Sequence, residues 1–330
     1  MSRLFACLLL LVIWTQPAMS QAPSPTTFEE HMSLAADLFK KEKIDEAIKE
    51  FETALALDPN NVVVENWLGF CHQQLGFNFQ RQDKQDAAVA EFVKAIHNFE
   101  RAVELDADYA EGHNNLASVY QQLSRLDKSE EHYKKALALK PDFKEARFNL
   151  AYVLSQLKKN DEAIAEFQKV IAADAKFVDA YYQIGCLYHK KADKVKAAEF
   201  YNKCLELDPK NAAAITKLGV LDLQEGHKEQ AFTQFEKALA IDPNFYEAHI
   251  SQGTIYLDTN DTAKALTKLA KALEINPYDD QVHFQLGRLF FRQQRFKDAI
   301  DQLNQAIYLN PENTDAKQEL EKVIEAKKKV

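Results

Sequence analysis

Residues 178–211 read VDAYYQIGCLYHKKADKVKAAEFYNKCLELDPKN, and residues 212–245 read AAAITKLGVLDLQEGHKEQAFTQFEKALAIDPNF. These two stretches of 34 residues carry the same residue types at the same offsets. Position 8 is glycine in both, position 20 is alanine, position 24 is a large aromatic residue and position 32 is proline. Apolar residues at helical spacing, ended by a proline that cannot continue a helix, predict two helices in each stretch.

The same unit recurs along nearly all of the chain after residue 27. Position 8 is glycine or alanine in every copy, position 20 is alanine in all but one, and a large apolar residue follows at position 24. The chain is therefore predicted to be an all-α tandem array. Its copies span 28–61, 62–109, 110–143, 144–177, 178–211, 212–245, 246–279 and 280–313.

The spacing has a physical reason. Two antiparallel helices approach closely only where both present small side chains, which explains the small residues at positions 8, 20 and 27. The large residue at position 24 lies one helical turn after position 20 and is expected to fill the groove toward the neighbouring copy. A single helix pair cannot bury its apolar face, so the copies are expected to stack.

The second copy, 62–109, is fourteen residues longer than the others. Its second helix contains two overlapping triplets, Ala88/Phe92/Ala95 and Ala95/Phe99/Ala102. Because fourteen is twice seven, we expect both helices to be longer by about two turns with the same faces in contact. The tip of this hairpin is predicted near Gln82–Gln85. Phe77 and Phe79 either zip the longer hairpin together or form a second docking surface.

This pattern resembles the tetratricopeptide repeat (TPR) family over residues 28–313. The resemblance implies a right-handed α-solenoid of about eight helix–turn–helix units. One departure is position 4, where the usual aromatic residue is replaced in most copies, in four of them by histidine (His31, His113, His249 and His283). We interpret these histidines as half-buried structural side chains rather than metal ligands. Residues 314–330 are expected to form a capping helix and a basic tail, with Thr314 able to cap the helix.

The first 20 residues have the pattern of a secretory signal peptide. Arg3 precedes the apolar stretch Leu4–Trp14, and Ala18-Met19-Ser20 has the form of a cleavage site. An uncleaved anchor is the alternative, although a membrane span needs about 20 apolar residues. Residues 21–27 are interpreted as a linker. The protein is therefore expected to be exported, periplasmic or secreted, with no membrane span after cleavage.

Composition restricts the function classes. The net charge of -9 argues against nucleic acid as a partner. Neither CxxC, HExxH, GxSxG nor a glycine-rich phosphate loop occurs. We therefore expect no catalytic residues, no cofactor, no metal and no small-molecule substrate, and the chain is not expected to be an enzyme. The odd set Cys71, Cys186 and Cys204 is no disulfide framework, and either free thiols or a Cys186–Cys204 bridge would fit.

The resemblance also indicates where a partner would bind. In TPR arrays the first helix of each repeat lines the inner face at positions 2, 5, 6, 9, 12 and 13. The family's clamp for a terminal carboxylate needs lysine at position 5, and no copy has it. Amides at position 6 are similar to the asparagine ladder of O-GlcNAc transferases, although Lys217 and Ser251 interrupt them. The partner-binding candidates are Asn66, Asn115, Asn149, Tyr152, Tyr182, Gln183, Phe284, Arg288, Phe291 and Arg292.

Each candidate has a structural alternative. The amides and arginines can be solvated surface residues, and the aromatic residues can turn into the core between copies. The function expected is a protein–protein interaction scaffold or assembly factor in the cell envelope, which binds other proteins or peptides on the inner face. The alternative is a chaperone-like binder of extended polypeptides through the inner amides and aromatic residues.

Overall fold

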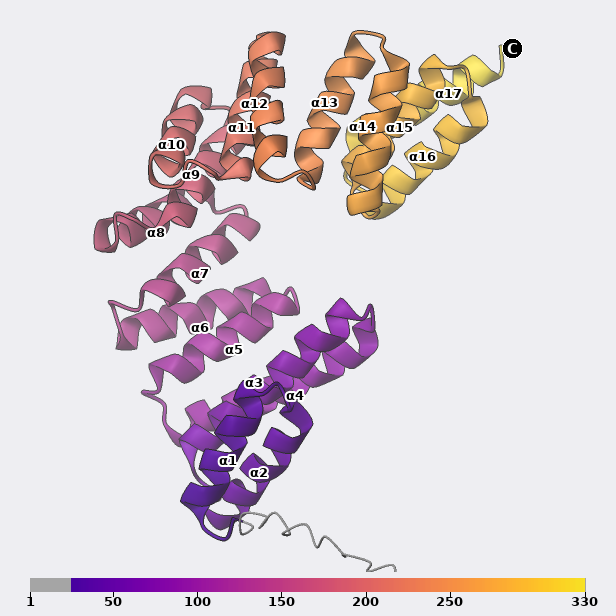
Figure 1. Cartoon of the computed structure of the whole chain (residues 1–330). Coiled ribbons are helices and arrows are strands. Elements are labelled where there is room, and N and C mark those ends of the chain that lie inside the picture. Colours follow the sequence, from indigo (N-terminus) through magenta and orange to yellow (C-terminus); the bar gives the residue numbers. More distant parts are fainter. Residues whose placement is uncertain (1–24, 330) are drawn as a thin grey trace, which may run out of the picture. The chain divides into compact units, whose positions relative to one another are not determined.

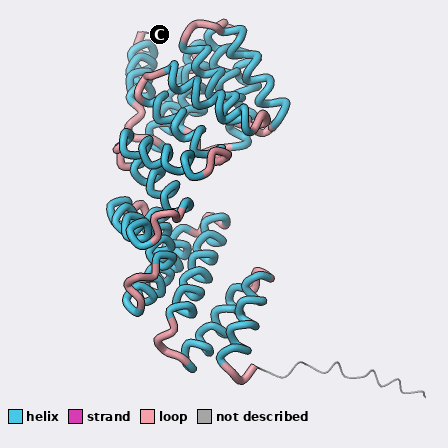
Figure 2. Tube along the Cα trace, turned by 90° about the vertical axis from the view of Figure 1, so that its left-hand side faces the viewer, coloured by secondary structure: helices cyan, strands magenta, loops and turns pink. Residues whose placement is uncertain are grey.

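The structure, a computed structural model, describes residues 25–329. Seventeen helices joined by short loops make up this part of the chain, and none of it is β-strand (Figure 1). Helix is accordingly the only regular element in the trace (Figure 2). The predicted all-α solenoid class is confirmed. The predicted signal peptide, residues 1–20, and residues 21–24 of the predicted linker lie outside the described residues.

The chain divides into two compact units, and the first ends at Leu123. The helices of unit 1 are α1 (Phe28–Lys40), α2 (Ile44–Leu57), α3 (Val62–Arg81), α4 (Gln85–Leu105) and α5 (Ala110–Gln122). Helices α1 and α2 pack as one antiparallel pair and α3 and α4 as the next, with α2 against α3 and α4 against α5. Unit 1 is therefore a stack of helix pairs.

Unit 2 begins at Ser124 and is built in the same way. Helix α6 packs on α7, each later odd-numbered helix pairs with the even-numbered helix after it, and α17 packs on α16. The twelve helices are α6 (Leu126–Leu139), α7 (Lys144–Gln156), α8 (Asn160–Ala173), α9 (Val178–Lys190), α10 (Lys194–Leu207), α11 (Ala212–Gln224), α12 (Lys228–Ile241), α13 (Tyr246–Asp258), α14 (Thr262–Ile275), α15 (Asp280–Arg292), α16 (Phe296–Leu309) and α17 (Thr314–Lys327).

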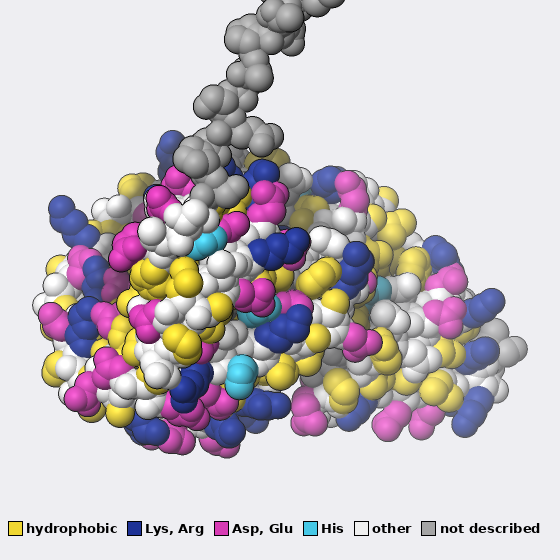
Figure 3. Space-filling model, turned by 90° about the horizontal axis from the view of Figure 1, so that it is seen from below, with side chains coloured by type: hydrophobic (Ala, Val, Ile, Leu, Met, Phe, Trp, Pro, Cys, Tyr) yellow, Lys and Arg dark blue, Asp and Glu magenta, His cyan; other side chains and the backbone are white. Residues whose placement is uncertain are grey.

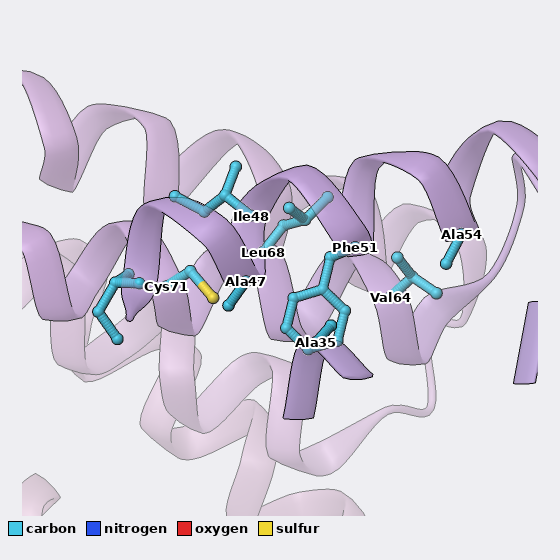
Figure 4. Close-up of a cluster of buried hydrophobic side chains, with 9 residues drawn as sticks. Ala35, Ala47, Ile48, Phe51, Ala54, Val64, Leu68 and Cys71 are labelled. Carbon is cyan, nitrogen blue, oxygen red and sulfur yellow. The ribbon is translucent and has the colours of Figure 1, made fainter. Parts of the chain in front are cut away.

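Small residues beneath a large one hold each pair together. In the first pair, Ala35 of α1 and Ala47 of α2 are fully buried beside the ring of Phe51 (Figure 4). That ring also stacks on Trp67 of α3, with 5.6 Å between the ring centroids. The large residue at position 24 thus covers the small residues of its own pair as well as touching the next. The contact with Trp67 agrees with the expectation that this residue reaches toward the neighbouring copy.

The long α3–α4 hairpin repeats one set of contacts after seven residues. A Cβ atom on Gly69 would lie 2.5 Å from the ring of Phe99, and a Cβ on Gly76 would lie 2.6 Å from the ring of Phe92. The polar contacts are duplicated too. Asn98 donates to Glu65 at 2.8 Å, and seven residues along each helix His72 contacts Glu91 at 2.7 Å. Two extra turns in each helix therefore keep the same faces together. Despite their length, neither these two helices nor any other described helix is long and apolar enough to cross a membrane.

Position 4 contributes, in five of the helix pairs, a polar contact that fixes the first helix to the turn before it. In several pairs its side chain hydrogen bonds to the backbone carbonyl six residues earlier. The donors are His113 to Ala107, Arg147 to Pro141, Tyr181 to Ala175, His249 to Pro243 and His283 to Pro277. The three histidines are buried, and no cluster of metal-ligating side chains occurs among residues 25–329. Burial and carbonyl partners fit the structural role expected for these histidines.

The C-terminal helix α17 is capped by Asn313 rather than by Thr314. The Asn313 side chain accepts a hydrogen bond from the backbone N–H of Ala316 at 2.9 Å, so Thr314 is the first helical residue. Asn313 also donates to Asp280 of α15 at 2.6 Å, which fixes the start of α17 to the preceding helix pair. Ala316 and Val323 of α17 are buried against α16, so the helix covers the last pair as expected of a cap.

The turn within each helix pair depends on one residue with a left-handed backbone. These residues have φ between 55° and 88°, and they are Glu42, Asp83, Ser124, Lys158, Ala192, Gly226, Asn260 and Gln294. Only one of the eight is glycine. Because the left-handed region costs a residue with a Cβ atom roughly 1–2 kcal/mol, seven of the turns store strain that packing of the two helices offsets.

We expect Ala192→Gly to raise the free energy of unfolding by about 0.5–1 kcal/mol. The substitution removes the Cβ atom that makes φ of 60° unfavourable, although glycine also loses more entropy on folding. Ala165→Gly, at an exposed position in the middle of α8, is the control and should lower stability by about 1 kcal/mol. Urea unfolding followed by circular dichroism measures both, and a loss of stability in Ala192→Gly would contradict the strain.

Candidate functional site

Successive first helices of unit 2 carry two adjoining cavities. One has a volume of about 340 Å³ and is lined by Cys186, His189, Lys190, Tyr201 and Lys217. The other has a volume of about 260 Å³ and shares Lys217. Its remaining lining residues are Thr216, Val220, Leu223, Glu247, Ile250, Ser251, Thr254, Asp279, Gln281 and Gln285. We call the two cavities together the Lys217 groove.

The groove follows from the repeat. Residues at positions 5, 6 and 9 of one helix lie on one side of it, because position 9 follows positions 5 and 6 by about one turn. In α11 these positions hold Thr216, Lys217 and Val220, and in α13 they hold Ile250, Ser251 and Thr254. Most of the lining is therefore supplied by the same positions of successive copies, and the groove runs from one helix pair to the next.

One buried hydroxyl in the groove has no partner. Thr216 is 2% exposed, and its Oγ1 atom has no hydrogen-bond partner among the described residues. The neighbouring hydroxyls are satisfied locally: Ser251 donates to the carbonyl of Glu247 at 2.8 Å, and Thr254 donates to that of Ile250 at 2.9 Å. Burying an unpaired hydroxyl costs roughly 1–3 kcal/mol, so Thr216 is a group that a ligand can satisfy.

The two cavities differ in charge. Lys190 and Lys217 line the first, and neither has an ion-pair or hydrogen-bond partner within the described part of the chain. Glu247 and Asp279 line the second, where Asp279 also caps α15 by accepting from two backbone N–H groups. On the face drawn in Figure 3, by comparison, acidic and basic side chains are intermixed. The groove therefore has a basic end and an acidic end.

His189 lines the same cavity as the two lysines and is a neutral side chain. Its burial, together with the nearby Lys217 and Lys194, lowers the pKa of His189 below the ordinary value for histidine. The Gln224 side-chain amide donates to Nε2 of the ring at 3.1 Å, which requires that nitrogen to be unprotonated. At neutral pH the positive charge of this cavity thus comes from the lysines alone.

The described cysteines are free thiols, so the bridge considered between Cys186 and Cys204 is not formed in this structure. Burial raises the pKa of Cys71 to about 12 and that of Cys204 to about 11, which makes both poorly reactive. Cys186 is half-buried in the wall of the first cavity, where the Tyr201 hydroxyl donates to its sulfur at 3.5 Å. It contributes an apolar surface there.

In unit 1, two of the candidate amides bond each other. Asn115 of α5 donates to Asn66 of α3 at 2.8 Å, and Asn114 donates to Asn115 at 3.2 Å. Asn66 and Asn115 are both buried. The pair thus fixes one first helix to the next.

The candidate aromatic residues of unit 2 lie mostly within the core. Tyr182 packs against Tyr201 with 5.9 Å between ring centroids, and burial raises its pKa above the ordinary value for tyrosine. Phe284 and Phe291 pack on the core that α15 shares with α16 and α17. Tyr152 is the exception, since 37% of it is exposed. For Tyr182, Phe284 and Phe291, the alternative that the aromatic side chain turns into the core therefore fits the packing.

The candidate arginines are held by α13. Arg288 donates to Asp258 at 3.2 Å and to Gln285 at 2.8 Å, and Arg292 donates to the carbonyl of Leu257. The bonds to Asp258 and Leu257 fix α15 to the end of α13. Of the remaining candidates, Asn149 and Gln183 are half-buried, on α7 and α9.

Phe77 and Phe79 lie on the lengthened part of α3 and close the hairpin. Phe77 meets Phe92 of α4 edge-on with 5.4 Å between ring centroids. Phe79 packs on the same core, and the Lys84 ammonium lies 5.8 Å from the centroid of its ring. Both side chains are half-buried, which favours the zipper over a second docking surface.

Lys217, Thr216 and Ser251 were not among the candidates, although they occupy inner positions 6, 5 and 6 of their copies. The candidates followed the amides at position 6, and Lys217 and Ser251 interrupt that pattern. The interruption was itself the available signal. A cationic residue and a small residue at successive position 6 sites leave an open space beside an unpaired charge, and that space is the groove.

Family comparison agrees with this repeat geometry. Profiles described as tetratricopeptide repeat match residues 110–143, 132–165, 178–211, 216–280 and 256–323, and one described as TPR repeat matches 36–76 and 152–191. Together they cover most of the chain. The chain belongs to the tetratricopeptide repeat family. No curated protein sequence matches this TPR protein significantly.

Solved structures show the same fold. A TPR protein from Parabacteroides merdae matches with a TM-score of 0.63 and 15% identity, over 78% of this chain and 99% of that one. The yeast Tom70 matches with a TM-score of 0.57 and 16% identity, over 92% and 82%. The APC/C hetero-tetramer Cut9–Hcn1 matches with a TM-score of 0.61 and 16% identity, over 89% of this chain and only 55% of that one. At these identities the likeness extends to the fold alone.

The lowered pKa of two histidines predicts a pH dependence of stability. Burial lowers the pKa of His249 as well as that of His189. As pH falls through the ordinary histidine pKa of about 6.5, the unfolded chain takes up protons that the folded state resists, so stability is lost.

The double variant His189→Gln/His249→Gln should therefore lose less unfolding free energy between pH 7 and pH 5 than the parent, by up to about 1.4 kcal/mol per pH unit for each histidine. Chemical unfolding at several pH values measures this difference. His227→Gln, at an exposed histidine, is the control. Equal pH dependence in the parent and the double variant would show that burial of these rings does not govern their titration.

Proposed function

We propose that this TPR protein is an interaction scaffold that binds a partner protein through a segment lying in the Lys217 groove. The observation that carries the proposal is the pair of adjoining cavities, lined by apolar, hydroxyl and amide side chains from successive repeats. Binding sites commonly combine such apolar walls with a few polar groups that orient the ligand. A TPR stack also offers a large surface without the residues that chemistry requires, so holding a partner is the function this architecture suits.

The dimensions of the groove favour an extended segment. Neighbouring packed helices lie roughly 8–10 Å apart. Alternate side chains of an extended peptide point the same way and lie about 7 Å apart. Side chains two or three residues apart in a partner can therefore enter the two cavities.

A chaperone-like binder using the inner amides and aromatic residues is less well supported. Asn66 and Asn115 bond each other, and Tyr182, Phe284 and Phe291 contribute to the core. These groups cannot bind an extended chain without giving up contacts that stabilise the stack. The groove needs no such rearrangement.

Thr254→Tyr should abolish this binding by filling the second cavity. The measurement is the affinity of synthetic peptides, selected from a displayed library of random dodecamers on the purified chain, by isothermal titration calorimetry. We expect a loss of at least about tenfold, because the phenol occupies the space of the partner's side chain.

Thr267→Tyr is a matched control within the same repeat. Both threonine hydroxyls donate to the carbonyl four residues earlier, but Thr267 is exposed on α14 and lines neither cavity. It should bind as the parent does. Peptides that bind both variants equally well would place the interaction outside the groove and contradict the proposal.

We also propose that the scaffold works outside the cytoplasm, in the periplasm or as a secreted assembly factor. Support comes from the N-terminal sequence, with Arg3, the apolar stretch Leu4–Trp14 and the cleavage-type ending at Ser20.

Expression of the full chain in a bacterial host tests this location. We expect the protein in the periplasmic fraction with Gln21 as its first residue, as determined by mass spectrometry. Leu9→Arg, which puts a charge into the apolar stretch, should leave the chain uncleaved in the cytoplasm. A parent chain that stays soluble in the cytoplasm and retains residues 1–20 would refute export.

A further inference from the structure

We propose that the Lys217 groove recognises a partner segment with one acidic side chain followed by neutral residues. The acidic group lies between Lys190 and Lys217, and the next inward-pointing residue enters the second cavity with a polar atom on Thr216 Oγ1. This inference rests on the proposed function and adds the chemistry of the partner. The segment is recognised through its charge and its hydrogen-bonding groups.

The two lysines are the first argument. Several other lysines of unit 2 have an acidic partner, such as Lys144 with Asp174 at 2.9 Å and Lys159 with Glu130 at 2.7 Å. Lys190 and Lys217 line one cavity without such a partner among the residues described. Two like charges beside one cavity repel each other, and a carboxylate placed between them removes that repulsion. The cavity is thus complementary to a single negative group.

The walls around these lysines strengthen the interaction. Cys186 and Tyr201 give the cavity an apolar wall, and neutral His189 adds no charge of its own. A charge-assisted hydrogen bond beside such a wall is less weakened by water than one on an open surface. An acidic side chain held here should therefore contribute more than an ordinary surface ion pair.

Thr216 is the second, independent argument. Its hydroxyl is buried and unpaired in the wall of the adjoining cavity, while the hydroxyls of Ser251 and Thr254 are occupied by their own helix. A hydroxyl both donates and accepts, so it can bond a carbonyl, an amide or a hydroxyl of the segment. Because Lys217 is the next residue along α11 and lines both cavities, one segment can reach both groups.

The acidic end of the groove determines which residues can follow the acidic one in the partner segment. Glu247 and Asp279 line the second cavity, so a second carboxylate entering there would meet two negative side chains. Like-charge contacts of this kind exclude a ligand more effectively than missing contacts do. The groove should therefore reject a run of acidic residues and accept an acidic residue followed by Ser, Thr, Asn, Gln or an apolar residue.

The test uses the random dodecamer library displayed against the purified full chain. Binders are sequenced, and the enriched peptide is synthesised with its acidic residue intact, replaced by the corresponding amide, or preceded and followed by further acidic residues. Affinities are measured by calorimetry at low and high salt. We expect the amide form to bind about tenfold more weakly, and the affinity of the acidic form to fall with salt.

Two substitutions in the protein separate binding from folding. Lys217→Gln should weaken the acidic peptide about tenfold and leave the amide peptide unchanged, whereas Lys237→Gln, which removes an exposed charge from α12, should change neither. Thr216→Val keeps the shape and removes the unpaired hydroxyl. It should weaken binding about fivefold while the thermal unfolding temperature of the free protein stays the same or rises, a pattern that a structural role would not give.

The outcomes distinguish the inference from the function on which it rests. Two outcomes overturn the acidic-segment inference and leave the scaffold proposal intact. In the first, the peptides fail to bind Thr254→Tyr but contain no acidic residue. In the second, they fail to bind Thr254→Tyr but bind Lys217→Gln as tightly as the parent. Peptides that Thr254→Tyr does not block overturn both. Acidic peptides that lose affinity in Lys217→Gln and in Thr216→Val, with the control unchanged, support the inference.

Discussion

The whole structure depends on the contact between the small residue at position 8 and the large side chain at position 24 of the same helix pair. Glycine or alanine lets the ring or the leucine lie directly on the backbone of the first helix, as Tyr201 does over Gly185. That close approach fixes the angle between the two helices. The same close approach lets the large side chain reach the next helix pair, where the ring of Phe51 stacks on Trp67. One contact thus closes a pair and begins the stacking of the next.

Much of this architecture could be predicted from the sequence, because the packing that creates it recurs at a fixed period. The identity of Gly69 and Phe99 as partners follows from their offsets, and so does the greater length of α3 and α4. Details that depend on a single local bond were harder to anticipate. Asn313 and Thr314 are both good helix caps, and only the bond from Asn313 to the Ala316 N–H decides between them.

The proposed binding surface could be predicted by position in the repeat but not by residue type. Inner positions of successive repeats do line the groove, yet whether an inner side chain is available depends on its neighbours in the next repeat. Asn115 is occupied because Asn66 lies opposite it, and Arg288 because Asp258 does. Lys217 is available because Ser251 is small and leaves space beside it. A sequence read one repeat at a time does not contain these pairings.

The duplicated contacts of the α3–α4 hairpin mean that a TPR hairpin can change its length only in matched steps. Adding seven residues to one helix and seven to the other returns every glycine, ring and polar partner to an equivalent neighbour, as Gly76 with Phe92 echoes Gly69 with Phe99. An increment far from a whole number of turns would rotate one helix so that a wrong face met its partner. Evolution can therefore lengthen or shorten the α3–α4 hairpin at its tip without changing the contacts that join the hairpin to adjacent repeats.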